Sequence, residues 1–94
     1  MYGTVARMHV KPGMGGSLEQ LTAEYEALDV PGHVATHVFQ LDSGPDDYYL
    51  VVIFTDRDAY RRNADDPAQN ERYVEYRALM EDEPEWHDGE IETG

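Results

Sequence analysis

The chain has 94 residues, 40% of them apolar, and none is cysteine. This length allows one small domain, and the missing thiols exclude a disulfide framework, a thiolate zinc site and a cysteine nucleophile. Asp and Glu number 20 against 7 Lys and Arg, and the net charge of −13 would repel phosphate backbones and anionic lipids. We therefore expect neither a nucleic-acid nor a membrane partner.

The first predicted strand covers residues 2–10, which mix β-branched and small side chains and stop at the breaker sequence 11–13. A helix is expected next, because Ser17 and Gln20 have the spacing of a capping box. Residues 30–32 (Val-Pro-Gly) end it. Its apolar residues recur at helical spacing: Leu18, Leu21, Tyr25 and Leu28.

Residues 33–41 form the second predicted strand, residues 42–47 a hairpin loop, and residues 48–54 the third strand. The third strand is apolar at consecutive positions, so both of its faces should be covered. His33 and His37 are four residues apart on the second strand, so we expect them to share a face but to lie too far apart to chelate a single metal ion.

A second helical region is predicted to begin after Asp56 and to break at 65–67, where Asp66 suits an N-cap and Pro67 the first helical position. Its apolar stripe ends at Glu83-Pro84. Residues 86–92 form an acidic edge-type strand.

This order, β-α-β-β-α-β, predicts an α+β, ferredoxin-like sandwich in one domain over residues 1–94, with two helices on one face of a four-stranded antiparallel sheet. The helices leave the other face bare. We therefore expect a homodimer in which two sheets cover each other.

Three segments resemble the antibiotic biosynthesis monooxygenase (ABM) family: residues 3–13, residues 31–34 and residues 59–64. The resemblance extends over essentially the whole chain. It implies the dimeric α+β barrel, in which two ferredoxin-like protomers join sheet to sheet.

The family includes cofactor-independent monooxygenases that oxidise anthrone-like aromatic polyketides, and haem-degrading enzymes. In the anthrone oxidases an Asn on the second helix faces a pocket, and Asn63 occupies the matching place. Their tryptophan near this helix is missing here, since the only Trp is Trp86, in the last strand. Asn63 and Tyr73 stand where the haem-degrading branch has Trp and His, and the first strand has no Asn, which disfavours haem degradation. The resemblance implies a monooxygenase that needs no metal or cofactor and acts on a small aromatic, polyketide-like substrate.

Asn63 is the first catalytic candidate, because an amide in a dry pocket can polarise a ketone or stabilise an oxyanion. His9 or His37 could take the proton from a phenolic or benzylic substrate. Structural alternatives stay open: Asn63 could solvate a helix end, and the histidines could line a dimer interface.

Tyrosines supply the candidate walls of a pocket for a flat aromatic ligand, and Arg62 could meet an anionic group on it. The alternatives are core tyrosines with hydroxyls at the rim, and surface ion pairs between arginines and the acidic tail. The residues assigned to substrate binding are Tyr73, Tyr25, Tyr60, Arg62 and Trp86.

The rival function is a non-catalytic dimer that binds a small ligand or acts as an accessory protein. Convergence of Asn63 and a histidine on one closed pocket would favour the enzyme. The start of the sequence lacks the pattern of a signal peptide, and the longest apolar run, 48–54, is too short to span a bilayer, so a cytoplasmic location is expected.

Overall fold

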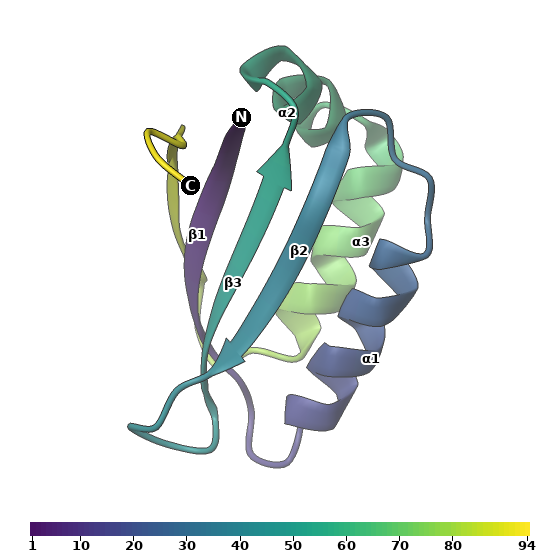
Figure 1. Cartoon of the computed structure of the whole chain (residues 1–94). Helices are drawn as coiled ribbons and strands as arrows, with labels where there is room; N and C mark the ends of the chain where they lie inside the picture. The colour runs from purple at the N-terminus through teal and green to yellow at the C-terminus, as the bar shows by residue number, and fades with distance from the viewer.

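A computed structural model describes residues 1–94, and it contains four strands and three helices (Figure 1). In chain order these are β1 (Tyr2–His9), α1 (Gly15–Glu26), β2 (His33–Gln40), β3 (Asp47–Phe54), α2 (Arg57–Ala64), α3 (Pro67–Ala78) and β4 (Glu85–Glu90).

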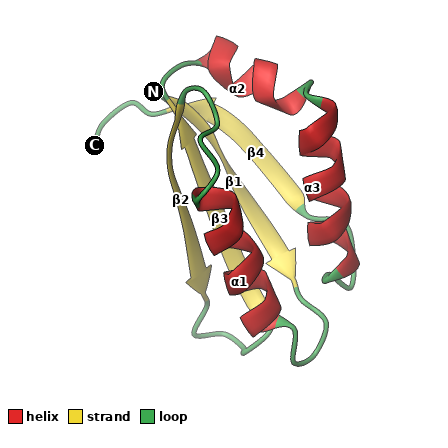
Figure 2. Cartoon of the chain, turned by 90° about the vertical axis from the view of Figure 1, so that its right-hand side faces the viewer, coloured by secondary structure: helices red, strands yellow, loops and turns green.

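The four strands form one antiparallel sheet in the order β2-β3-β1-β4. Helices α1 and α3 cover one face, and α2 crosses the end of the sheet near the start of β1 (Figure 2). The ferredoxin-like α+β prediction is thus confirmed. The predicted break in the second helical region is also confirmed, and it separates two helices. Asp66 caps α3: its carboxylate accepts from the Ala68 amide at 2.9 Å, and Pro67 follows at the first position.

The predicted capping box at the start of α1 is wrong. The helix begins at Gly15, and its N-cap residue, Met14, makes no side-chain cap. The Met14 carbonyl accepts from the Leu18 amide at 3.0 Å, so helical hydrogen bonding is already established one turn before Leu18. Ser17 therefore lies inside the first turn and caps nothing.

The two histidines of β2 do not share a face, contrary to the sequence-based expectation. The register shifts between His33 and Ala35: His33 pairs with Phe54, and Ala35 pairs with Ile53. Two steps on β2 thus match one step on β3, as in a β-bulge, and the alternation of side chains is displaced by one residue. His33 lies on the helix side with Phe54, whereas His37, opposite Val51, lies on the other side.

Large apolar side chains fill the half of the covered face that lies toward the end of β1. Met8, Val10, Leu18 and Met80 are each at most 1% exposed. The cluster that they form continues into Ala6, Leu50, Tyr48 and Tyr76. This cluster fixes α1 and α3 on the sheet.

The opposite face of the sheet carries no covering element (Figure 1). Val5 is 42% exposed, Phe39 53% and Tyr49 37%, and the cross-strand register places all three on this face. We call it the open face. None of the three helices combines the length and the apolar character that crossing a membrane requires.

Candidate functional site

The other half of the covered face contains a row of short side chains that crosses all four strands. Asp88, Thr4, Val52 and Thr36 are successive cross-strand partners, on β4, β1, β3 and β2. Partners in adjacent strands point to the same side of a sheet and lie about 5 Å apart. Because none of the four side chains is long, the row leaves a hollow between sheet and helices.

The helices roof this hollow and create a cavity of about 370 Å³. Its lining is mainly apolar and aromatic, with a few polar tips, as is usual for sites that bind flat organic ligands. The aromatic residues in the lining are Tyr25, Phe54, Tyr60, Tyr73, Tyr76 and Trp86.

Asn63 enters the cavity from the last turn of α2. Asp56 sets the start of this helix, because its carboxylate accepts from the Ala59 amide at 2.8 Å. The Asn63 side-chain amide donates to the Tyr25 hydroxyl at 3.1 Å, and the Arg72 guanidinium lies 5.0 Å from the centre of the Tyr25 ring. The amide is therefore held in place, with Tyr25 as its partner on α1.

Tyr60 and Asp88 form a polar pair at the β4 side of the cavity. The Tyr60 hydroxyl donates to Asp88 Oδ1 at 2.9 Å, and the Tyr60 ring packs edge-on against Phe54 at 5.7 Å. Burial, followed by the hydrogen bond to Asp88, raises the pKa of Tyr60 far above that of a free phenol. The Tyr60 phenol consequently stays protonated and acts as a hydrogen-bond donor to the Asp88 carboxylate.

Tyr73 and Trp86 form a second aromatic wall, with ring centres 6.2 Å apart. The Tyr73 hydroxyl donates to Glu83 at 2.9 Å. Burial raises the pKa of Tyr73, and the hydrogen bond to Glu83 raises it further. Trp86 comes from β4, so the strand supplies an indole ring at a cavity that α2 and α3 roof.

The structure brings together five of the residues selected from sequence: Asn63, Tyr25, Tyr60, Tyr73 and Trp86 all line the cavity. Arg62 does not line it. Arg62 points into a separate cleft beside Pro31 and Asp66, on the other side of Asn63.

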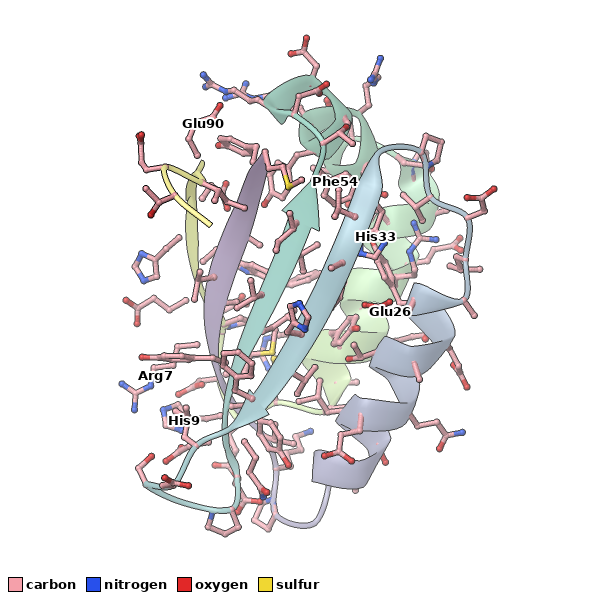
Figure 3. The ribbon with its side chains drawn as sticks, viewed as in Figure 1. Arg7, His9, Glu26, His33, Phe54 and Glu90 are labelled. Atoms are coloured by element: carbon pink, nitrogen blue, oxygen red, sulfur yellow. The ribbon has the colours of Figure 1, made fainter.

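His9 and His37 lie on the open face, away from the cavity. Figure 3 shows His9 beside Arg7 on the side of the sheet that faces away from the helices. The His9 Nδ1 atom is 2.8 Å from an Asp47 carboxylate oxygen, and the His37 ring stacks on Phe39 with centres 6.5 Å apart. Within one chain, neither histidine reaches Asn63.

Sequence reasoning missed His33 as a neighbour of the cavity. Its Nε2 lies 2.7 Å from the hydroxyl of Thr36, and Thr36 lines the cavity. Its ring packs edge-on against Tyr25 at 5.8 Å and Phe54 at 5.5 Å, on the helix side (Figure 3). The bulge is what brings it there. Pro31-Gly32 just before the strand is the one local signal of irregular backbone, since Gly32 adopts a positive φ of 80°.

No group of three or more His, Asp or Glu side chains is close enough to hold a metal ion. The polar groups of the cavity lining are hydroxyls, amides, one indole N–H and one carboxylate. Such an arrangement can bind a flat molecule, exclude water and stabilise charge on an oxygen atom of that molecule.

Residues 1–71 match the sequence profile of a known family, antibiotic biosynthesis monooxygenase. This match covers well over half of the chain. The chain belongs to the ABM family. The resemblance noted in the sequence is thereby confirmed, while a search among curated proteins finds no match.

Solved structures share the ABM fold with this chain. SnoaB, a cofactor-independent oxygenase from Streptomyces nogalater, superposes with a TM-score of 0.83 at 23% identity, over 99% of this chain and 94% of SnoaB. An asparagine-to-alanine mutant of SnoaB gives a TM-score of 0.84 at 22% identity, with the same coverage. A conserved protein from Methanosarcina mazei gives 0.79 at 18% identity, over 94% of this chain and 89% of that protein. At these identities the likeness establishes the fold.

Proposed function

We propose that this ABM protein is a monooxygenase that needs no metal or flavin and oxidises a small aromatic substrate of the anthrone type. The observation that carries the proposal is the cavity of about 370 Å³, walled by aromatic rings and entered by the Asn63 amide. Membership of the ABM family and the fold shared with SnoaB, a cofactor-independent oxygenase, add support.

The proposed reaction converts a ring methylene to a carbonyl. The substrate carbon loses two hydrogens and gains one atom of O₂, and the second atom leaves as water. The substrate supplies all four electrons, so no external reductant is required. The first step is loss of a proton to give a carbanion, which passes an electron to oxygen. The protein would bind, orient and desolvate the substrate and stabilise its anion, which preorganised donors do best in a water-poor site.

We assign the polarising role to Asn63. Its amide lies in the cavity wall and is held by Tyr25, so it is positioned before the substrate arrives. A second hydrogen of the same amide group is available for a substrate oxygen, because a side-chain amide has two donors.

We assign the proton acceptor to His33, acting through Thr36. His9 and His37 face away from the cavity, whereas the Thr36 hydroxyl lines it and lies 2.7 Å from His33 Nε2. With Nε2 unprotonated, Thr36 donates its proton to His33 as it receives one from the substrate. A histidine suits this task because its ordinary pKa, about 6.5, lies near neutral pH.

Oxygen consumption with a panel of anthrones and hydroquinones tests this function. Wild type should consume oxygen with at least one anthrone, and Asn63→Ala should lower kcat by about 100-fold, the usual cost of removing one oxyanion donor. Gln20→Ala removes an exposed amide on α1 and should leave kcat unchanged. If His33 is the base, kcat of the wild type should increase as the pH is raised and the imidazole loses its proton. His33→Gln should abolish this increase in kcat with pH. Absence of oxygen consumption with every compound, together with ligand binding, would establish the rival non-catalytic binding role.

We also propose that two copies associate through their open faces. The apolar side chains on this face are exposed, and the two carboxylates on its strands each lie 2.8 Å from a histidine nitrogen: Asp47 from His9 and Glu85 from His87. Both carboxylates therefore have a hydrogen-bond partner within their own chain, although the net charge of −13 on each chain still opposes association. Sedimentation at micromolar concentration should show a dimer that Phe39→Asp converts to a monomer. Val74→Asp, on an exposed position of α3, should leave the dimer intact, and a monomeric wild type would refute the proposal.

A further inference from the structure

The Thr4 hydroxyl is exceptional among the polar groups of this chain. Thr4 is 4% exposed, and its Oγ1 is the one buried side-chain nitrogen or oxygen atom that makes no hydrogen bond. It lies in the floor of the cavity, in the row between Asp88 and Val52. A buried hydroxyl without a partner is unfavourable, and an apolar side chain of the same shape would avoid the cost.

The other hydroxyls in the cavity wall all have partners within the protein. Tyr60 donates to Asp88, and Tyr73 donates to Glu83. The remaining three pairs are Tyr25 with Asn63, Thr36 with His33 and Tyr76 with Thr22. An interaction between the Thr4 hydroxyl and the Tyr60 oxygen partly offsets the rise in the pKa of that phenol, but the two groups do not reach the distance and angle of a hydrogen bond. Thr4 is thus the one hydroxyl of the cavity wall that has no hydrogen-bond partner in the protein, so a ligand that binds it displaces nothing.

We propose that Thr4 is a specificity-determining residue that donates a hydrogen bond to an oxygen substituent on the aromatic ligand. The inference rests on the proposed function for the existence of an aromatic ligand, and it narrows that ligand to a ring system bearing a carbonyl or phenolic oxygen. Thr4 contacts it from the sheet, and Asn63 from the helices. A hydrocarbon of the same shape leaves the Thr4 hydroxyl unpaired, and a site built in this way discriminates strongly against such an analogue.

The test compares anthrone with 9,10-dihydroanthracene, which has the same three-ring framework without the carbonyl. Binding is measured without oxygen, so that turnover does not interfere. Trp86 is the only tryptophan in the chain and lines the cavity, so its fluorescence reports occupancy directly. Wild type should bind anthrone at least about tenfold more tightly than dihydroanthracene.

Thr4→Val should reduce this ratio to near one by weakening anthrone binding alone, and its melting temperature should equal or exceed that of wild type. Thr4→Ser keeps the hydroxyl and should keep most of the preference. Should Thr4→Val not fold, Thr4→Ala provides the same comparison. An unchanged preference in the hydroxyl-free variant, an equal loss for both probes, or no binding of either probe by wild type would overturn the inference.

Oxygen consumption by the same variants separates this inference from the proposed function. Anthrone binding that depends on Thr4 without any oxygen consumption would retain the inference and reject the monooxygenase. Oxygen consumption with a preference independent of Thr4 would do the reverse.

Discussion

The two halves of the helix-covered sheet face are built from the same strands and helices but pack in different ways. In one half, Met8, Tyr48, Leu18 and Met80 belong to one packed cluster, and none of them lines the cavity. In the other half, Thr4, Val52 and Thr36 occupy equivalent positions on the same strands, and a cavity remains. Side-chain volume in successive cross-strand rows therefore decides which half is core and which is a site.

The helices add to this difference. α1 and α3 extend over both halves, since Leu18 of α1 belongs to the packed cluster while Tyr25 of α1 and Tyr73 of α3 line the cavity. α2 crosses the end of the sheet (Figure 2) and contributes to the cavity wall but not to the packed cluster. The hollow half also contains several side-chain hydrogen bonds, among them Asn63 with Tyr25 and Tyr60 with Asp88. The packed half thus stabilises the fold, and the hollow half provides a preformed cavity with polar groups in its wall.

The largest effect should follow from truncation in the packed half. Met8 is 1% exposed, and Met8→Ala should lower the free energy of unfolding by about 2–5 kcal/mol, because it removes buried contacts and leaves a void. Val52→Ala, in the hollow half, should cost clearly less, since Val52 already borders empty space. Urea unfolding followed by circular dichroism measures both. Equal losses would show that the two halves do not differ in packing.

The next largest effect should follow from filling the cavity. Val52→Phe adds a ring to the cavity wall, and the available volume of about 370 Å³ should accept it without the strain that overpacking usually causes. Anthrone affinity should fall at least about tenfold, equivalent to 1.4 kcal/mol, with stability unchanged or raised. Val74→Phe makes the same replacement at a position that is 66% exposed and should bind as wild type. Unchanged affinity in Val52→Phe would place ligand binding elsewhere.

The fold could be predicted from sequence because local signals agree along the chain. The apolar run of β3, the cap at Asp56 and the Asp66-Pro67 break each specify one element, and their order leaves few topologies. The exception is the start of α1, where Ser17 and Gln20 have the right spacing for a cap and the backbone hydrogen bonds begin earlier. A capping motif indicates that a helix is near, and its exact first residue depends on the turn before it.

The candidate site was predicted in part, for a reason that lies in strand register. Tyr25 and Tyr73 could be selected from their helical spacing and Asn63 from the family resemblance, and all three line the cavity. The face occupied by each histidine could not be predicted, since one inserted residue near Val34 inverts the alternation and places His33 and His37 on opposite faces of the sheet. Thr4 and Asp88 gave no signal, because their pairing across β1 and β4 connects distant parts of the sequence.

A moderate effect is expected at the boundary between the two halves. The Thr22 hydroxyl lies 3.0 Å from the Tyr76 hydroxyl, joining α1 to α3, and both residues are buried. A double-mutant cycle with Thr22→Val and Tyr76→Phe should give a coupling energy of about 1 kcal/mol, typical of one buried neutral hydrogen bond. Tyr73→Phe removes a hydroxyl bonded to the exposed Glu83 and should cost less. A coupling energy near zero would mean that packing alone joins the helices.

The smallest effect should appear as the pH rises toward 10. Burial is the main cause that raises the pKa of Tyr60 and Tyr76 above the value of 10.0 for a free phenol, so the folded state keeps protons that the unfolded chain releases. Their contribution to the free energy of unfolding is therefore complete well below pH 10 and decreases as the pH rises through 10. At pH 10 itself the loss is a few tenths of a kcal/mol per phenol. Absorbance at 295 nm should show these tyrosines ionising only with unfolding, and Tyr60→Phe should flatten the decline in stability between pH 9 and 11, a window set by the ordinary phenol pKa of about 10. Tyr60 ionising in the folded protein at the pH of free tyrosine would mean that water reaches the hollow half of the face freely, and the cavity would then lack the water-poor surroundings that the proposed function requires.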